Sequence, residues 1–382
     1  MSNPLKYIPP RLREELLLAR GLVKNLGSDT AKRLKKSAAK DDPTFYAAPR
    51  DIKLWSDAFK KLSLATDKRG FELAEEFYSQ PLEIISENYF PRKQELVLIC
   101  PAKDELENLK RIYSHYKRLG VKAFAFIDNG SSDGTAEYFS DFRDVNVYLA
   151  TEKYTSLRRQ AWINRVMARY GFGKWYLVVD SDEYLDYNGS ENRSIYDIAN
   201  YCDKKGIKRV KALMLDMYPE KINFDGREVD FLKEYCYFDK SGYTQISGRD
   251  ELLIKGFQGG VRARIFAENE NDKKPWLTKY PLIYLQPGDI QFQSHMSYPF
   301  YKNFNSDTFM VLRHYKFLPS DYEKYKLRAA DGNFSAGSRE YQQYVQMMKK
   351  GSISFYDNKV SAKLEDSSSV YQIDIMSEFN WE

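Results

Sequence analysis

A group of acidic residues directly follows an apolar run near the middle of the chain. Asp180, Asp182 and Glu183 come after residues 175–179, whose aromatic and β-branched side chains predict a buried strand. In open α/β sheets, ligands bind at the carboxyl ends of strands, so these acids stand where a site is expected. Side chains two positions apart on a strand point the same way, and carboxylate oxygens bind hard cations. The pattern predicts that Asp180 and Asp182 share one divalent cation, which could neutralise a diphosphate.

Acidic residues also end strands without any functional role, so the neighbouring segments must decide. Two more apolar runs are followed by polar segments: residues 96–100 precede 101–105, and residues 123–127 precede 128–135. Two glycines in the second polar segment allow a tight turn. An amphipathic helix pattern separates the two runs, so strands and helices alternate. This alternation indicates a parallel sheet with right-handed crossovers, which brings the three polar loops to one edge.

Together these segments resemble the motifs of bacterial family 2-like glycosyltransferases, which have the GT-A fold and a DxD motif. The matching segments are residues 103–105 (KDE), 127–135 (IDNGSSDGT), 179–185 (VDSDEYL), 215–219 (LDMYP), 259–266 (GGVRARIF), 279–282 (KYPL) and 313–318 (RHYKFL). Asp104 departs from the pattern, because many relatives have Asn there. The resemblance covers roughly residues 95–355. It implies an α/β, Rossmann-like fold with a mostly parallel sheet flanked by helices, preceded by a helical N-terminal extension.

The resemblance also implies an activity. Such an enzyme transfers a sugar from a nucleoside-diphosphate donor, with a UDP-sugar favoured, to a hydroxyl of a glycan or glycolipid acceptor. Inversion and a role in surface polysaccharide or glycoconjugate synthesis are implied as well. We expect Asp182 and His314 to hold Mn²⁺ or Mg²⁺, with Asp180 beside them and Glu183 orienting the loop. Arg159 is expected at a phosphate. The residues expected to border the nucleoside are Ala102, Glu105, Asp128 and Asn129.

An inverting transfer needs a base that takes the proton of the acceptor hydroxyl. Asp250 is the favoured candidate because it follows the DxD motif by about 70 residues, where this fold commonly presents a carboxylate. Glu251, Asp216 and His295 are the alternatives. His115 lies in a helix pattern and is expected to be a packing or surface residue. Two other functions stay open: a DxD-type phosphatase, and a catalytically silent scaffold that binds nucleotide-sugars.

The composition agrees with a folded enzyme. At 382 residues with 43% hydrophobic content, the chain can bury a large core. Its three cysteines form no CxxC pair, so neither a disulfide framework nor a zinc site is expected. No apolar run reaches the length of a transmembrane helix, and the N-terminus lacks the apolar core of a signal peptide. We expect a cytoplasmic protein.

The basic excess of the chain is N-terminal. The formal net charge is +5, while residues 1–40 carry ten Lys or Arg against three acids. An apolar stripe at helical spacing accompanies these charges. It predicts a helix that packs on the protein or a partner, or one that contacts an anionic membrane surface at the inner face of the membrane. Nucleic-acid binding is not expected, since no recognised module accompanies the charge.

The expected domains are a basic, mostly helical extension over residues 1–90, a catalytic domain over 91–355 and a C-terminal tail over 356–382. Within the catalytic domain, residues 220–260 lack a clear period and are expected to form a flap bordering the acceptor. The expected secondary structure there is a strand at 210–215 and helices at 196–206, 308–325 with a break at Pro319, and 340–348.

Overall fold

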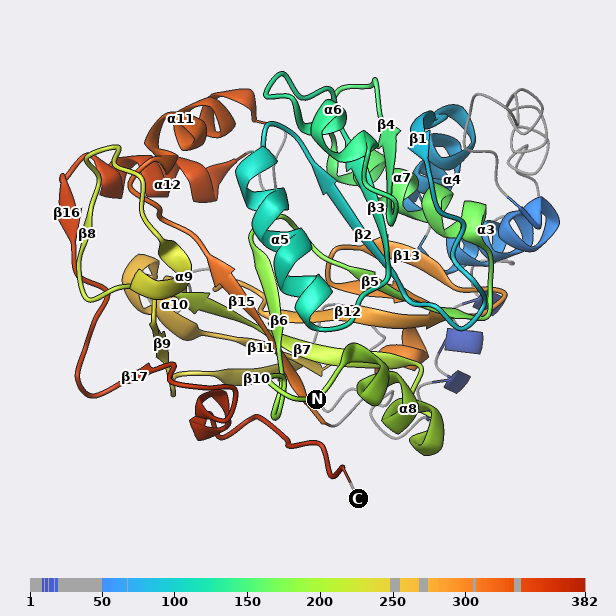
Figure 1. Cartoon of the computed structure of the whole chain (residues 1–382). Helices are drawn as coiled ribbons and strands as arrows, with labels where there is room; N and C mark the ends of the chain where they lie inside the picture. Colours follow the sequence, from blue (N-terminus) through green and yellow to red (C-terminus); the bar gives the residue numbers. More distant parts are fainter. Residues whose placement is uncertain are drawn as a thin grey trace.

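A nine-stranded sheet forms the centre of the computed structural model (Figure 1). The structure describes residues 9, 11–12, 14–16, 18–19, 50–66, 68–247, 255–267, 274–304, 307–332 and 338–381. The strand order is β1-β4-β3-β2-β5-β12-β7-β15-β6. In that order the strands are Glu83–Glu87, Val145–Leu149, Ala123–Asp128, Val97–Ala102, Lys174–Val178, Thr278–Leu285, Arg209–Met217, Met310–Tyr315 and Glu183–Asp186.

Most of these strands run in one direction. β4, β3, β2 and β5 are parallel neighbours, and so are β7 and β15. β12 lies between the two groups and is antiparallel to both β5 and β7. The edge strands β1 and β6 are also antiparallel to their neighbours. The predicted fold class, an α/β protein with a mostly parallel sheet flanked by helices, is confirmed.

Helices cover both faces of the sheet. From residue 50 onward, the α-helices in the described ranges are α3 (Ile52–Thr66), α4 (Lys68–Ser79), α5 (Leu106–Arg118), α6 (Thr135–Ser140), α7 (Ser156–Tyr170), α8 (Ile195–Lys205), α9 (Phe231–Glu234), α10 (Gly260–Phe266), α11 (Asp321–Asp331) and α12 (Arg339–Met348). Alternate residues of β2 enter different cores: Leu98 and Cys100 pack beneath α5, while Val97 and Ile99 pack beneath α7. This alternation of side chains along a strand is why the short apolar runs predicted buried strands.

Short two-stranded sheets occupy the region predicted to be a flap. The pairs are β10 (Thr244–Ser247) with β11 (Lys255–Gln258), β8 (Ile222–Asn223) with β16 (Ser352–Ile353), and β9 (Tyr237–Asp239) with β17 (Ser361–Lys363). A further hairpin joins β13 (Ile290–Gln293) to β14 (Met296–Tyr298). Each of these strands has two to four residues, too few for a period to be read from the sequence.

The prediction of helix over residues 308–325 was wrong before Pro319, while the break at Pro319 and the helix beyond it are confirmed. The chain forms β15 at Met310–Tyr315, and α11 begins only at Asp321, beyond Pro319. β15 is hydrogen-bonded to β7 on one side and β6 on the other. A strand buried on both faces has no alternation of polar and apolar residues, which made this segment resemble a buried helix. The helices expected at 196–206 and 340–348 and the strand at 210–215 are confirmed by α8, α12 and β7.

Both ends of the described chain join the main body. β1 pairs with β4, and α4 contacts α7, so part of the expected N-terminal extension completes the sheet and one of its cores. At the other end, the Phe379 ring stacks on Phe309 with centroids 4.6 Å apart. The domain boundaries at residues 90 and 355 stay predictions. Within the described ranges, no helix has the length and apolar character needed to span a membrane.

Candidate functional site

The polar loops after β2 and β3 are locked to each other. The Asp104 amide donates to Ser131 Oγ at 2.9 Å, and the Ser132 amide donates to Asp104 Oδ1 at 2.6 Å. Asp133 Oδ2 accepts from the Leu106 amide at 2.8 Å, at the start of α5. Asp104 has a positive φ of 51°, a conformation that Asp adopts more readily than most residues. This residue, where the family resemblance was weakest, therefore holds the two loops together.

The acidic segment after β5 forms a turn. Residues 181–182 turn, so Asp180 and Asp182 do not alternate as they would on a strand, and the cluster that could hold a metal is formed by Asp182, Glu183 and His314. A cation shared by Asp180 and Asp182 stays a prediction. Asp180 is held by two cations: the Arg159 guanidinium donates to Oδ1, and Lys279 Nζ donates to Oδ2 at 2.9 Å. Partial burial works against the charged form, but these two cations hold the pKa of Asp180 well below its ordinary value.

Glu183 shares the same lysine. Its side chain is only 1% exposed; one carboxylate oxygen accepts from Lys279, and the other accepts from the Asp180 amide at 3.1 Å. Burial raises the pKa of Glu183, and Lys279 opposes this shift. Glu183 thus stabilises the turn through these two contacts, which fits the predicted role of orienting the loop.

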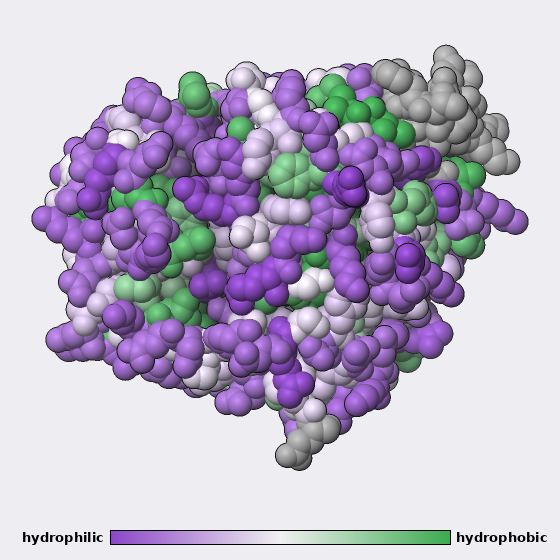
Figure 2. All heavy atoms as spheres, viewed as in Figure 1, coloured by the Kyte–Doolittle hydropathy of each residue, from purple (hydrophilic) through white to green (hydrophobic). Residues whose placement is uncertain are grey.

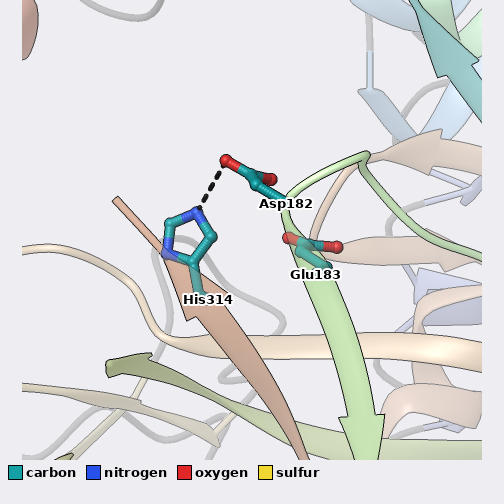
Figure 3. Close-up of side chains that lie close together, drawn as sticks. All are labelled: Asp182, Glu183 and His314. Carbon is teal, nitrogen blue, oxygen red and sulfur yellow. Dashed lines mark ion pairs between the residues drawn. The ribbon is translucent and has the colours of Figure 1, made fainter. Parts of the chain in front are cut away.

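Asp182 lies on the open side of the turn and faces His314 (Figure 3). His314 Nε2 is 3.4 Å from Asp182 Oδ2, and one ligand atom from each of Asp182, Glu183 and His314 lies within 4.8 Å of the other two. His314 comes from β15 and is in register with Glu183 on the neighbouring β6. Strand pairing therefore brings together residues that are far apart in the sequence, as the resemblance implied for Asp182 and His314.

The second ring nitrogen of His314 contacts another buried acid. Nδ1 is 2.6 Å from Asp216 Oδ1, on β7. Burial by itself lowers the pKa of His314, but the carboxylates of Asp182 and Asp216 raise it above its ordinary value. Burial would raise the pKa of Asp216, but Arg262 and His314 lower it to about 2. The His314 ring is therefore fixed between two ionised carboxylates, with Nε2 on the side of Asp182.

The residues of this cluster fit a divalent cation. Asp182 retains 32% of its side-chain exposure, so its carboxylate is open to an incoming ion. A carboxylate oxygen and an imidazole nitrogen suit Mn²⁺, while Mg²⁺ prefers oxygen ligands throughout. The carboxylate that fixes the opposite ring nitrogen is the partner that metal-binding histidines usually have. Glu183 is the least available of the three because Lys279 and a backbone amide already occupy its oxygens.

The residues predicted to border a nucleoside lie at the same edge. Ala102 and Asp128 are paired in register at the ends of β2 and β3. The Asn129 side-chain amide donates to the carbonyls of Ala150 and Glu152, both at 2.8 Å, so it fixes the loop after β4. Burial raises the pKa of Asp128, whose carboxylate accepts from the Ser131 amide at 3.2 Å.

Glu105 is held by residues of α11. Lys324 Nζ lies 2.6 Å from its carboxylate, and an Arg328 nitrogen lies 3.5 Å away. Beside it is a cavity of about 890 Å³, whose wall is formed by Glu105, Lys324, Arg111 and the segment 228–231, among others. Residues expected to belong to the flap therefore line a cavity next to this edge.

The predicted base stays a prediction. Asp250 and Glu251 lie outside the described residues. Of the alternatives, Asp216 is already bonded to His314 and Arg262, and His295 Nδ1 is 2.8 Å from the Thr278 carbonyl.

Sequence reasoning missed two positively charged side chains of the site, those of Lys279 and Arg262. Both stand in segments that carried the family resemblance, but neither was given a role. Their signal was a charged residue inside an apolar run, as in Lys279 on β12, whose side chain is 7% exposed. A buried Lys requires acidic partners, so its presence already predicted that carboxylates lie nearby.

Comparisons with known proteins found similarity in solved structures alone. No family model and no curated protein matches the chain. Glucosyl-3-phosphoglycerate synthase from Mycobacterium tuberculosis, in complex with Mn²⁺, UDP and glucosyl-3-phosphoglycerate, is 15% identical with a TM-score of 0.23 over 32% of this chain. The match covers 44% of that enzyme, less than half of its length. TarS from S. aureus is 13% identical with a TM-score of 0.27, and the match covers 67% of this chain and 71% of that one.

Proposed function

We propose that this chain is a metal-dependent glycosyltransferase, which moves a sugar from a nucleoside-diphosphate donor to a hydroxyl acceptor with inversion. A UDP-sugar is the favoured donor, and synthesis of a surface polysaccharide or glycoconjugate is the proposed setting. The observation that carries the proposal is the pairing of Asp182 with His314 at the edge of the sheet where β2 and β3 end and the loops after them begin. Cation ligands beside nucleoside-binding loops are what transfer from a nucleoside diphosphate requires.

In this proposal Asp182 and His314 hold Mn²⁺ or Mg²⁺. When bound, the cation supplies positive charge that stabilises the departing diphosphate. Asp216 orients His314 through Nδ1, and Glu183 with Lys279 supports the turn that carries Asp182. These roles are proposed from the contacts that each side chain makes.

The nucleoside is proposed to lie along the ends of β2 and β3, with Ala102, Glu105, Asp128 and Asn129 around it. Arg159 and Asp180 form an ion pair next to this edge. Arg159 would therefore reach a phosphate only by sharing or exchanging that partner. The Arg159 side chain is 7% exposed, which favours a fixed positive charge beside the diphosphate over a mobile side chain.

The acceptor is proposed to occupy the cavity beside Glu105. The cavity volume of about 890 Å³ is large enough for a glycan end, and its polar wall can bind hydroxyls. Asp250 remains the proposed base, with Glu251, Asp216 and His295 as alternatives. Asp216 is the weakest of them, because its two salt-bridge partners favour the ionised form and make it a poor proton acceptor.

The test is turnover of nucleotide-sugars. The chain is incubated with a panel of donors and glycan acceptors in Mn²⁺, Mg²⁺ or chelator, and nucleoside-diphosphate release is measured together with the anomeric configuration of the product by NMR. Asp182→Asn should abolish cation-dependent release and keep its fold. The matched control Asp203→Asn, on the exposed side of α8, should retain full activity. Release of inorganic phosphate from phosphate esters would favour the phosphatase. Nucleotide-sugar binding without turnover would favour the scaffold.

Peripheral membrane contact through the basic N-terminus is part of the proposal. Most residues of that segment lie outside the described ranges. Its support is the charge excess of residues 1–40, which suits the anionic inner face of a membrane.

A further inference from the structure

Arg262 on α10 bridges two carboxylates that belong to different elements. Its Nε donates to Asp216 Oδ2 at 2.7 Å, and its Nη1 donates to Glu340 Oε1 at 2.7 Å. Glu340 stands in the first turn of α12 and also accepts from the Tyr344 hydroxyl. One side chain therefore ties α12 to the end of β7.

Asp216 is also the residue that fixes His314. Its other oxygen, Oδ1, contacts His314 Nδ1 at 2.6 Å. The contacts form a continuous series from the turn after β5 to α12, in which acidic and basic groups alternate. In order, the series is Asp182, His314, Asp216, Arg262 and Glu340.

We propose that Arg262 is a positioning residue for the cation site and that it couples α12 to this site. The inference rests on the proposed role of Asp182 and His314 as cation ligands. A guanidinium presents several donors in a fixed plane, so Arg262 can hold both carboxylates at once. With Asp216 held on one oxygen, the other oxygen stays directed at His314 Nδ1, which keeps Nε2 turned toward Asp182.

The coupling has to act in both directions. If contacts from α12 favour the ring orientation that binds the cation, then cation binding must stabilise those same contacts by an equal amount. Binding at Asp182 and His314 should therefore slow the opening of α12, although no residue of that helix touches the ion.

The chain contains a matched control for this idea. Arg264 lies two residues further along α10 and binds another buried acid, Asp239, through Nε at 3.0 Å and Nη2 at 2.8 Å. The hydrogen bonds that Arg264 forms go to Asp239 and to the Phe355 carbonyl, and not to the residues of the series. Arg262→Lys and Arg264→Lys thus make the same chemical change on one short helix, and only the first disturbs the series.

The first experiment measures Mn²⁺ affinity by calorimetry in the full chain. Loss of the direct partner of a metal-binding histidine weakens metal binding about 10-fold or more, and Arg262 acts through that partner, Asp216. Arg262→Lys should therefore weaken binding by up to about 10-fold, while Arg264→Lys should leave it unchanged. Equal affinities in wild type and Arg262→Lys, or equal losses in both variants, would overturn the inference. Should Arg262→Lys not fold, Glu340→Gln removes the charge at the far end, and a smaller loss of Mn²⁺ affinity is then expected; no loss would overturn it.

The second experiment measures amide hydrogen exchange in residues 339–348. Mn²⁺ should slow exchange there in the wild type and in Arg264→Lys, and by much less in Arg262→Lys. If the wild type binds Mn²⁺ and exchange in α12 does not change, the coupling is wrong while the proposed cation site stands. If the wild type does not bind Mn²⁺ at all, the proposed cation site fails and this inference fails with it.

Discussion

Replacing Lys279 with Met should be among the most damaging single changes to the stability of this protein. The Lys279 ammonium forms salt bridges with both Asp180 and Glu183, and the Glu183 side chain is 1% exposed. Without Lys279, Glu183 keeps the Asp180 amide as a partner but loses its counter-ion. Breaking a buried pair by removing one partner costs about 3–5 kcal/mol of unfolding free energy. Most of this cost should come from Glu183, because Asp180 is one-third exposed and still binds Arg159.

The assay is urea unfolding of wild type, Lys279→Met, Glu183→Gln and the double variant at pH 7. The double variant should recover a substantial part of the loss, because it contains no buried carboxylate at position 183. The control Lys326→Met removes an exposed lysine paired with Glu323, and its effect should stay within about 0.5 kcal/mol. A loss below about 1 kcal/mol in Lys279→Met, or strictly additive single effects, would refute the reasoning.

The remaining predictions concern binding, pH and the N-terminus. Lys316 is two residues beyond His314, its charge is among those that lower the pKa of Asp182, and its ammonium lies over two tyrosine rings. We expect Lys316→Gln to weaken pyrophosphate binding by about 10-fold in calorimetry, which corresponds to the loss of one charge-assisted contact. Nucleoside binding should not change. Burial lowers the pKa of His295 to about 4, so its neutral form stabilises the fold above the unfolded pKa of 6.5, and this stabilisation is lost as the pH falls toward 4. His295→Gln should therefore show a smaller drop in unfolding free energy between pH 7 and pH 5 than the wild type does. The full chain should sediment with anionic vesicles at low salt and be released by high salt, while a chain starting at Arg50 should remain in solution.

Local sequence patterns predicted β2, β3 and β5 in one half of the sheet and β7 in the other. Each of the first three strands is a short apolar run ended by polar residues, and the helix between β2 and β3 buries Leu109, Ile112 and Tyr116 as its period indicated. The other half was harder, because β15 is paired on both sides and has no period to distinguish it from a helix. In such strands, tertiary pairing decides the structure and local propensity does not.

The residues of the candidate site that belong to a sequence motif could be predicted. The ion-pair partners of its acidic residues could not. Asp182 and His314 were placed together from the resemblance, and the structure brings them to 3.4 Å. The partners of Asp180 could not be derived, because Lys279 reaches it from 99 residues away in sequence. Strand alternation was the basis for predicting a shared cation for Asp180 and Asp182; a turn replaces the strand at this point, and the shared cation stays a prediction. Buried charges are balanced by whatever the fold brings near, which a linear pattern does not contain.

The position of β12 has a consequence for the order in which the protein can be completed during synthesis. β5 ends at residue 178, while β12, the strand that covers its open edge and carries Lys279, begins at residue 278. Until β12 emerges from the ribosome, the nascent chain presents an unpaired strand edge next to acids that lack their lysine. Unpaired edges of this kind invite aggregation. Any fragment or premature stop that ends before residue 278 would leave this edge of β5 unpaired, so synthesis of β12 covers the edge and supplies Lys279 in a single step.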